Sequence, residues 1–345
     1  MPFSCLAPDH NRNRSIRNRQ ARAFTLLELL VTLAIVLVIC VALSQFVDET
    51  GKVWKSAATD HFVEAQQAFD TVAQNLAAAT LEPYQDYANS SGSFRISGTA
   101  NFSPDHLARR SDLDFVCGPA AGASGLLAGS NRTATGSAVF FLAPQGYSQT
   151  YPHQGMQQLL NACGYFVEFS DDSTAPSFVL SQSHFWRWRL KQVQQPTESL
   201  QIFAAPDSPT WLAQVISPQT PDTVLAENIL TLIVLPERAA ADTTLAPTFS
   251  YDSRNTTNKL TLHQLPPCVH LALVAMDDVA AQQLADRNGS VPPQLVPATL
   301  FQQATQLSAD LATLDQSLTA QQIQHRIFQR DIRLPAADWS ETPSP

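Results

Sequence analysis

The sequence has none of the short motifs that mark the common hydrolases and nucleotide-binding enzymes. Among its 345 residues there is no GxSxG nucleophile elbow, no HExxH helix and no glycine-rich phosphate loop. The five cysteines include no CxxC pair, and the eight histidines are scattered. Acidic pairs such as Asp171 and Asp172 do not repeat the ligand ladder of a calcium loop. The sequence therefore predicts no catalytic residue, no metal site and no cofactor.

Charge is also scarce, and it is distributed unevenly. Charged residues make up 15% of the chain, and 23 prolines outnumber 12 glycines, which favours a loop-rich β or α+β domain outside the cytoplasm. The first 23 residues hold five of the 21 basic residues and one of the 30 acidic residues. The remainder, with 16 basic and 29 acidic residues, has a net charge of −13. Because an acidic body repels phosphate backbones, nucleic acid is not an expected partner.

One long apolar run is present, from Phe24 to Val47. As a helix it would be roughly 36 Å long, enough to cross a bilayer core of about 30 Å. No signal-peptidase site follows Leu43, and the arginines before the run place the N-terminus in the cytoplasm. We therefore expect a single-pass inner-membrane protein with a periplasmic head. Glu28 is the only charged residue of the run, and a carboxylate in hydrocarbon needs a partner.

The residues ARAFTLLELLVTLAIV resemble the N-terminal signature of type IV pilins and type II secretion pseudopilins. The resemblance implies that a prepilin peptidase cuts between Ala23 and Phe24 and N-methylates Phe24. It also implies that Glu28 faces the terminal amine of a neighbouring pilin-like subunit, so the pair sets the register between subunits. The family usually has glycine before the cut, where this chain has Ala23. The alternative is a plain membrane anchor in which Glu28 snorkels to the interface.

A second helical segment is expected after the membrane run. Between Val53 and Leu81, apolar residues recur in steps of three and four, which predicts a helix with one packed face that ends at Glu82 and Pro83. Gly51 lies between the two helical halves, where we expect a bend. The apolar positions of this face are Ala58, Phe62, Ala65, Phe69, Val72 and Leu76.

The head that follows is expected to be rich in β-strands. In the stretch FWRWRLKQV, Trp186, Trp188 and Leu190 alternate with basic residues, the pattern of a half-buried strand. Stacking of single-stranded nucleic acid on these aromatics is the alternative, but aromatic and basic side chains would point to opposite faces. The candidate strands are Ser93–Ser97, Leu113–Gly118, Ala138–Ala143, Tyr165–Ser170, Phe185–Val193, Asn228–Pro236, Lys259–Gln264 and Cys268–Asp277.

The C-terminal region and the cysteines give two further expectations. Leucines and alanines in four-three steps predict a helix or helical pair of coiled-coil character from Ala298 to Arg330, followed by an extended or frayed tail. Cys117, Cys163 and Cys268 allow at most one disulfide, or else three buried thiols that pack as small apolar side chains.

Segments of the head sharpen the resemblance. TVLAENILTLIVLPE and LPPCVHLALVAMDD resemble the head of J-type minor pseudopilins, and they are still more similar to the pilin-like Verru_Chthon cassette proteins of type C. The resemblance implies an α+β, pilin-like fold, in which a long N-terminal helix packs on a β-rich head that precedes a C-terminal helical region. The expected boundaries are a leader at 1–23, a transmembrane helix at 24–50, an amphipathic extension at 51–82, the head at 83–290 and a C-terminal helix and tail at 291–345.

Three hypotheses for function follow. The first is a structural subunit of an envelope-spanning type IV pilus or type II secretion-like filament, whose partners are the prepilin peptidase, other pilin-like subunits and the inner membrane. The second is a pilin-like tip module that binds a substrate or surface. The third is a membrane-anchored ectodomain enzyme whose pilin-like start is a coincidence.

Overall fold

The computed structural model describes residues 62–96, 101–171, 185–202, 210–217 and 220–342, together with positions 30, 31, 35–37 and 39. The chain divides into two units, Met1–Ala57 and Ala58–Pro345. The described positions of the first unit are helical, and their apolar side chains are exposed. Within the described part of the chain, no helix has the length and apolar character needed to cross a membrane. Most of the predicted span at 24–50 lies outside the described residues.

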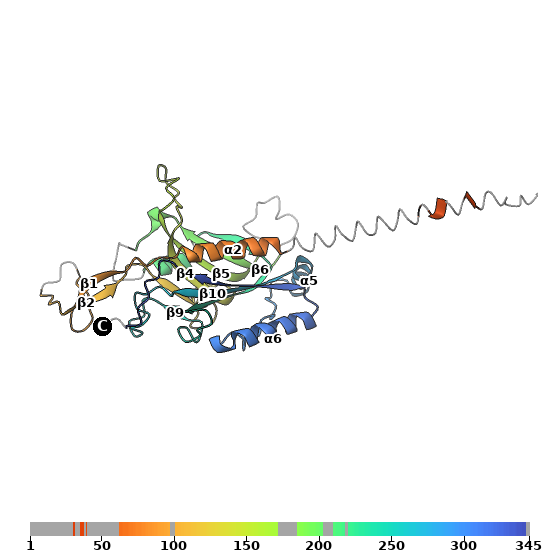
Figure 1. The fold of residues 1–345 in the computed structure, drawn as a ribbon. Helices are drawn as coiled ribbons and strands as arrows, with labels where there is room; N and C mark the ends of the chain where they lie inside the picture. The colour runs from red at the N-terminus through yellow and green to blue at the C-terminus, as the bar shows by residue number, and fades with distance from the viewer. Residues whose placement is uncertain are drawn as a thin grey trace, which may run out of the picture. The chain divides into compact units, whose positions relative to one another are not determined.

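The second unit is a mixed α+β head in which strands dominate (Figure 1). The helices are α2 (Val63–Ala77), α4 (Thr210–Ile216), α5 (Asp278–Asn288) and α6 (Leu307–Ala320). The strands are β1 (Tyr84–Ala88), β2 (His106–Arg110), β3 (Phe115–Pro119), β4 (Ala134–Pro144), β5 (Leu160–Ser170), β6 (Arg187–Gln195), β7 (Asp222–Glu227), β8 (Ile229–Glu237), β9 (Tyr251–Asp252), β10 (Cys268–Met276) and β11 (His325–Arg333).

The described strands form three antiparallel sheets. A six-stranded sheet has the order β7-β6-β5-β4-β3-β9, a three-stranded sheet has the order β11-β10-β8, and β1 pairs with β2. The two larger sheets meet where β4 approaches β8. Gly136, at φ 67°, lies there against Thr231 and Leu232 of β8, and a Cβ at this position would collide with both residues. A glycine is therefore required for the two sheets to come this close.

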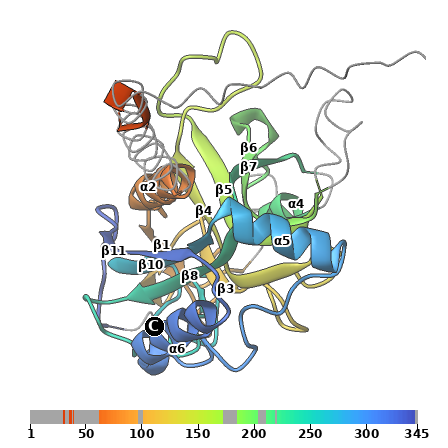
Figure 2. The ribbon, with the colours of Figure 1, turned by 90° about the vertical axis from the view of Figure 1, so that its right-hand side faces the viewer.

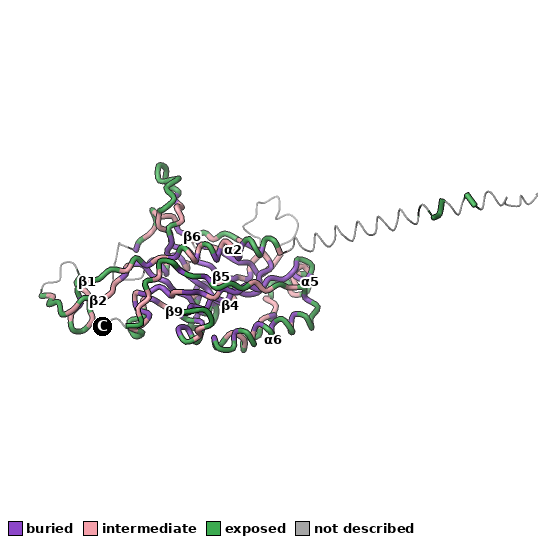
Figure 3. The backbone as a smooth tube through the Cα atoms, in the orientation of Figure 1, coloured by how far each residue is buried: buried purple, intermediate pink, exposed green. Residues whose placement is uncertain are grey.

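Helix α2 packs its apolar face on the head, as the spacing of its residues predicts. Ala65, Phe69, Val72 and Leu76 are all buried, and burying each large side chain contributes about 1.5–3 kcal/mol. In Figures 1 and 2, α2 lies on one side of the strands and α6 on the other. The buried residues concentrate on the strands between these helices (Figure 3).

The predicted end of this helix is wrong by four residues. The helix ends at Ala77, before the expected stop at Glu82. The Ala78 and Ala79 N–H groups close the last turn onto the carbonyls of Asn75 and Leu76, respectively. The Thr80 N–H donates to the Leu142 carbonyl of β4 at 2.9 Å. The chain leaves the helix early because the sheet supplies a partner for this backbone group.

Two of the predicted strands are not formed. In Ser93–Ser97, Phe94 makes only an isolated bridge with Ala88, and residue 97 lies outside the described residues. Lys259–Gln264 forms consecutive turns, in which the Thr261 and Leu262 N–H groups donate to the Asn258 carbonyl. Asparagine side chains in this loop also accept backbone N–H groups, which favours turns over a ladder. The other six predicted strands are confirmed, with shifted ends.

The C-terminal prediction is correct for one helix and wrong beyond it. Helix α6 buries four leucines at the predicted spacing, but it starts at Leu307, not Ala298. The chain then returns to the head as strand β11, which pairs with β10 over nine residues. The described tail is also packed, because Leu334 is buried and the Ser340 N–H donates to Gln264 Oε1 at 2.7 Å. The region after 291 is thus part of the head's sheet as well as its helical cover.

Helix α4 is fixed to the six-stranded sheet by a buried hydrogen bond. Trp211 is 2% exposed, and its indole N–H donates to Asp114 Oδ2 at 2.7 Å. Burial raises the pKa of Asp114 to about 6, and the hydrogen bond from Trp211 offsets only part of this effect. The Asp114 carboxyl therefore keeps its proton to a higher pH in the folded protein than in the unfolded chain.

This pKa predicts a pH dependence of stability. An unfolded Asp ionises near its ordinary pKa of 3.8, whereas folded Asp114 ionises near 6. The contribution of this group is therefore fully present below pH 3.8 and is lost as the pH rises through 6. Asp114→Asn keeps the acceptor for Trp211 but does not titrate. The free energy of unfolding of the wild type minus that of the variant should fall by about 2 kcal/mol between pH 4 and pH 7. Denaturant titrations of both full-length chains in detergent at several pH values measure this difference.

The exposed Asp286→Asn variant is the control and should show no such trend. A difference between the wild type and Asp114→Asn that stays constant across this pH range would show that Asp114 is ionised in the fold throughout.

Candidate functional site

The residues that the sequence assigns to processing and assembly are Ala23, Phe24 and Glu28, and all three lie outside the described residues. Farther along the same segment, the described positions are helical with apolar side chains between 48% and 61% exposed. A helix with outward-facing apolar side chains of this kind needs an apolar surrounding, either lipid or other helices. The exposed residues are Leu30, Val31, Ile35, Val36, Leu37 and Ile39.

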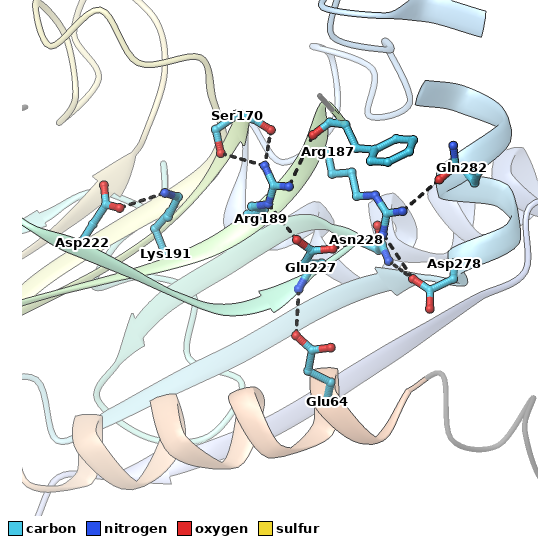
Figure 4. A network of polar contacts seen from close by, with 11 residues as sticks. Glu64, Ser170, Arg187, Arg189, Lys191, Asp222, Glu227, Asn228, Asp278 and Gln282 are labelled. Atoms are coloured by element: carbon cyan, nitrogen blue, oxygen red, sulfur yellow. Dashed lines mark hydrogen bonds and ion pairs between the residues drawn. The ribbon is translucent and has the colours of Figure 1, made fainter. Parts of the chain in front are cut away.

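Within the head, the basic strand β6 is the centre of a network of polar contacts (Figure 4). The prediction that β6 is half-buried is wrong, because both of its faces are withdrawn from water. Trp188 and Leu190 are buried on one face, and Arg189 and Lys191 are 3% and 7% exposed on the other. Buried cations require anions beside them, and these come from neighbouring strands.

The first cluster on this face balances two cations against two anions. Lys191 Nζ lies 2.8 Å from Asp222 Oδ1, and Arg132 Nη1 lies 2.7 Å from Asp222 Oδ2 and 2.8 Å from Glu168 Oε2. Burial raises the pKa of Asp222, but hydrogen bonds from Lys191 and Arg132 outweigh it, so the net shift is downward. Burial raises the pKa of Glu168 by more than Arg132 lowers it. The cluster fastens β7 and the segment before β4 to β5 and β6.

The second cluster lies at the other end of β6, next to the first turn of α2. Arg189 Nε and Arg187 Nη1 lie 3.0 and 3.1 Å from the two carboxylate oxygens of Glu227. Arg187 also lies 3.5 Å from Asp278 at the start of α5. Glu64 of α2 accepts the Glu227 backbone N–H at 3.2 Å, as Figure 4 shows. The contact covers part of the edge of β7 and joins it to α2.

Among the described residues, this second cluster has three carboxylates and two guanidinium groups. Burial raises the pKa of Glu64 and is the largest effect, and the negative charges of Glu227 and Asp278 add to it. No group of three or more His, Cys, Asp or Glu side chains suited to a metal occurs among the described residues. The contacts of this cluster organise the junction between α2, β7 and α5.

A cleft of about 840 Å³ opens beside the start of β4. Aromatic side chains line it, including Trp188, Phe249 and Phe301, together with polar groups such as Ser137 and Gln302. Every lining residue is uncharged. A surface of this kind suits a neutral ligand.

The three cysteines of the head are buried free thiols. Cys117 on β3 and Cys163 on β5 are separated by the intervening strand β4 and are offset by two residues along it, so their Cα atoms lie more than two strand spacings apart, beyond about 9–10 Å. A disulfide requires Cα atoms about 4.4–6.8 Å apart. Cys268 begins β10 in the other sheet. Burial raises the pKa of Cys163 to about 12, which disfavours the reactive thiolate.

Comparison with known proteins identifies one feature of the chain. Residues 18–44 match the prokaryotic N-terminal methylation motif. No curated protein and no solved structure matches the chain. The motif indicates a type IV pilin- or pseudopilin-like subunit that a prepilin peptidase processes, that assembles with other pilins and that is anchored in the envelope by its N-terminus. It favours a structural subunit over an enzyme.

The acids that neutralise β6 could not be assigned from the sequence. The alternating stretch RWRLK shows that cations lie on one face, but it does not show that this face is buried. Asp222 is 31 residues away from Lys191, and Glu168 is 36 residues away from Arg132. The only signal was the excess of acids in the body, which shows that counter-charges exist without showing where they lie.

The network predicts a large difference between two acidic residues that pair with cations. Asp222→Asn leaves Lys191 and Arg132 buried with a single carboxylate, so the free energy of unfolding should fall by about 3–5 kcal/mol. Asp70→Asn removes the partner of Arg330 in a half-exposed pair and should cost less than about 1 kcal/mol. Denaturant titration of both full-length variants measures the two values. Equal losses in the two variants would mean that the β6 cluster is solvated.

Proposed function

We propose that this chain is a minor pilin- or pseudopilin-like structural subunit of an envelope-spanning type IV pilus or type II secretion-like filament. The observation that carries the proposal is the methylation motif at residues 18–44, which contains Phe24, Glu28 and the residues around them. In this proposal the inner-membrane protein has a cytoplasmic leader at 1–23, a transmembrane helix at 24–50 and a periplasmic head. The mature subunit leaves the bilayer when it enters the filament.

In this proposal, the charge of the new N-terminus gives Glu28 a partner. Cleavage after Ala23 gives Phe24 a positive amine at the edge of hydrocarbon. The Glu28 carboxylate of one subunit then neutralises the Phe24 amine of its neighbour, because either charge alone is costly in low dielectric. The pair specifies the axial register of neighbouring helices more than it adds stability, which suits a subunit whose position in a filament must be defined.

The position of the subunit follows from the finer resemblance. The head segments resemble J-type minor pseudopilins and, more closely, Verru_Chthon cassette proteins of type C. The tip-most pseudopilins of the secretion family usually lack the acid that this chain keeps as Glu28. We therefore place the subunit within or just beneath a tip complex. The β-rich head with α2 packed along it supports this proposal, because pilin heads are carried on the second half of the N-terminal helix.

A second candidate is a pilin-like module that binds a substrate or surface. The uncharged cleft beside β4 favours it, because aromatic and amide side chains can bind a neutral ligand. The two candidates share the same anchor and processing, and they differ in whether the head's cleft is occupied during function.

The proposal predicts a defined N-terminus. The mature chain from native membranes should begin with N-methylated Phe24, because the peptidase cuts on the cytoplasmic side of the apolar run. Mass spectrometry of the N-terminal peptide measures this. Ala23→Gly, which restores the residue usual in the family, should be processed at least as completely. Ala23→Leu should block cleavage, because a bulky residue does not fit where a small one is read. An intact leader on the wild type, or a cut beyond Leu43, would contradict the proposal.

A further inference from the structure

Strand β11 is an edge of the three-stranded sheet. Its sole described neighbour is β10, and it is the outermost strand of that sheet (Figure 2). It spans nine residues, contains no proline and pairs with β10 without a register shift. Natural edge strands are usually shortened, bulged, covered or lined with charged side chains, because a straight edge is a template for another strand. Among the described residues, β11 has only the charged side chains.

The outward-facing backbone groups can be identified from the bonds at the two ends of the pair. The Asp277 N–H donates to the Gln324 carbonyl before β11, and the Leu334 N–H donates to the Pro267 carbonyl after it. Hydrogen-bonded pairs alternate along an antiparallel ladder, so the even-numbered residues of β11 bond to β10. The odd-numbered residues therefore direct their N–H and C=O groups away from the sheet. Those in the middle of the strand are Ile327, Gln329 and Asp331.

The two faces of β11 are occupied, whereas no described strand pairs with its outer edge. On the even-numbered face, Phe328 stacks on Phe69 of α2 with centroids 5.8 Å apart, and Arg330 pairs with Asp70 of α2 at 2.8 Å. On the odd-numbered face, His325 Nε2 lies 2.8 Å from Asp315 of α6. Helix packing thus stabilises the strand without using its outer backbone groups.

The edge carries positive charge on an acidic protein. Arg326, Arg330 and Arg333 are all exposed, and Arg330 already pairs with Asp70 of α2. The one exposed acid of the strand, Asp331, contacts His270 at 2.6 Å. Two copies of this edge would bring six arginines together, which disfavours self-pairing. An acidic strand would be attracted and would also satisfy the free backbone groups.

We propose that the outer edge of β11 binds an extended acidic segment of a partner protein by strand addition. Main-chain hydrogen bonds to Ile327, Gln329 and Asp331 supply the docking, and side chains set the specificity. Carboxylates four residues apart lie opposite Arg326 and Arg330, and an apolar residue midway between them lies opposite Phe328. This inference stands on the geometry of the head and does not require the proposed function.

The test uses the full-length chain in detergent and two nine-residue peptides. The first has glutamates four residues apart with a valine midway and threonines elsewhere, and the second has lysines in place of the glutamates. The glutamate peptide should bind, measured by fluorescence anisotropy, at least about tenfold more tightly than the lysine peptide. Hydrogen exchange should show protection of the Ile327, Gln329 and Asp331 amides. No binding, or protection elsewhere on the head, would overturn the proposal.

Two variants separate the backbone contribution from the charge. Gln329→Pro removes an outward N–H without removing a bond to β10, and proline is tolerated at such edge positions. It should weaken peptide binding by about tenfold or more, while Gln329→Thr, which keeps the N–H, should not. Arg326→Glu leaves the backbone intact and should reverse the preference between the two peptides. This variant therefore tests the proposal even if the proline variant unfolds. Unchanged binding by Arg326→Glu, or binding to anionic vesicles without amide protection, would contradict strand addition.

Discussion

A charge withdrawn from water must have an opposite charge beside it, and this constraint organises the head. Strand β6 is at the centre of the network because Arg189 and Lys191 are buried within it. Asp222 and Glu227, at the two ends of β7, neutralise these cations, which fixes β7 as the neighbour of β6 and gives α2 a polar contact at its first turn. The apolar face of α2 then closes the core on the same side. The burial of strand β6 thus determines which acidic elements pack around it.

The same constraint acts at the opposite end of the chain. Glu28 is the one charge of the apolar run, and in the proposed function its partner belongs to a neighbouring subunit. Within the head the buried cations Arg189 and Lys191 of β6 have their anions in the same chain. In the proposed function the N-terminal helix instead has a charge that is neutralised only on assembly.

Sequence patterns predicted elements whose own residues determine their state. The apolar runs of β4, β8 and β10 and the leucine spacing of α6 are of this kind. Predictions from these patterns were wrong where the state of a residue depends on another part of the chain. Strand β11 reads as the end of a helix in the sequence HRIFQRDIR, and it is a strand because β10 presents a free edge to it. The burial of Lys191 likewise depends on Asp222, which local spacing cannot reveal. The methylation motif could be recognised in the sequence because it consists of consecutive residues.

The central claim is that this chain enters an assembly through a charge pair at its N-terminus, and Glu28 tests it most directly. Glu28→Ala should be cleaved and inserted normally, because the peptidase acts on the leader and the first residues. It should nevertheless fail to enter the assembly, because a neighbour's amine would remain buried alone at a cost of about 3–5 kcal/mol. Glu28→Gln should be milder, since the amide still accepts a hydrogen bond.

The measurement is the size of the complex that contains the mature chain after mild solubilisation of native membranes, for wild type, both Glu28 variants and the control Thr32→Ala. The account predicts a large complex for wild type and Thr32→Ala and a monomer for Glu28→Ala. Normal incorporation of Glu28→Ala would contradict it and would make the protein an anchored ectodomain.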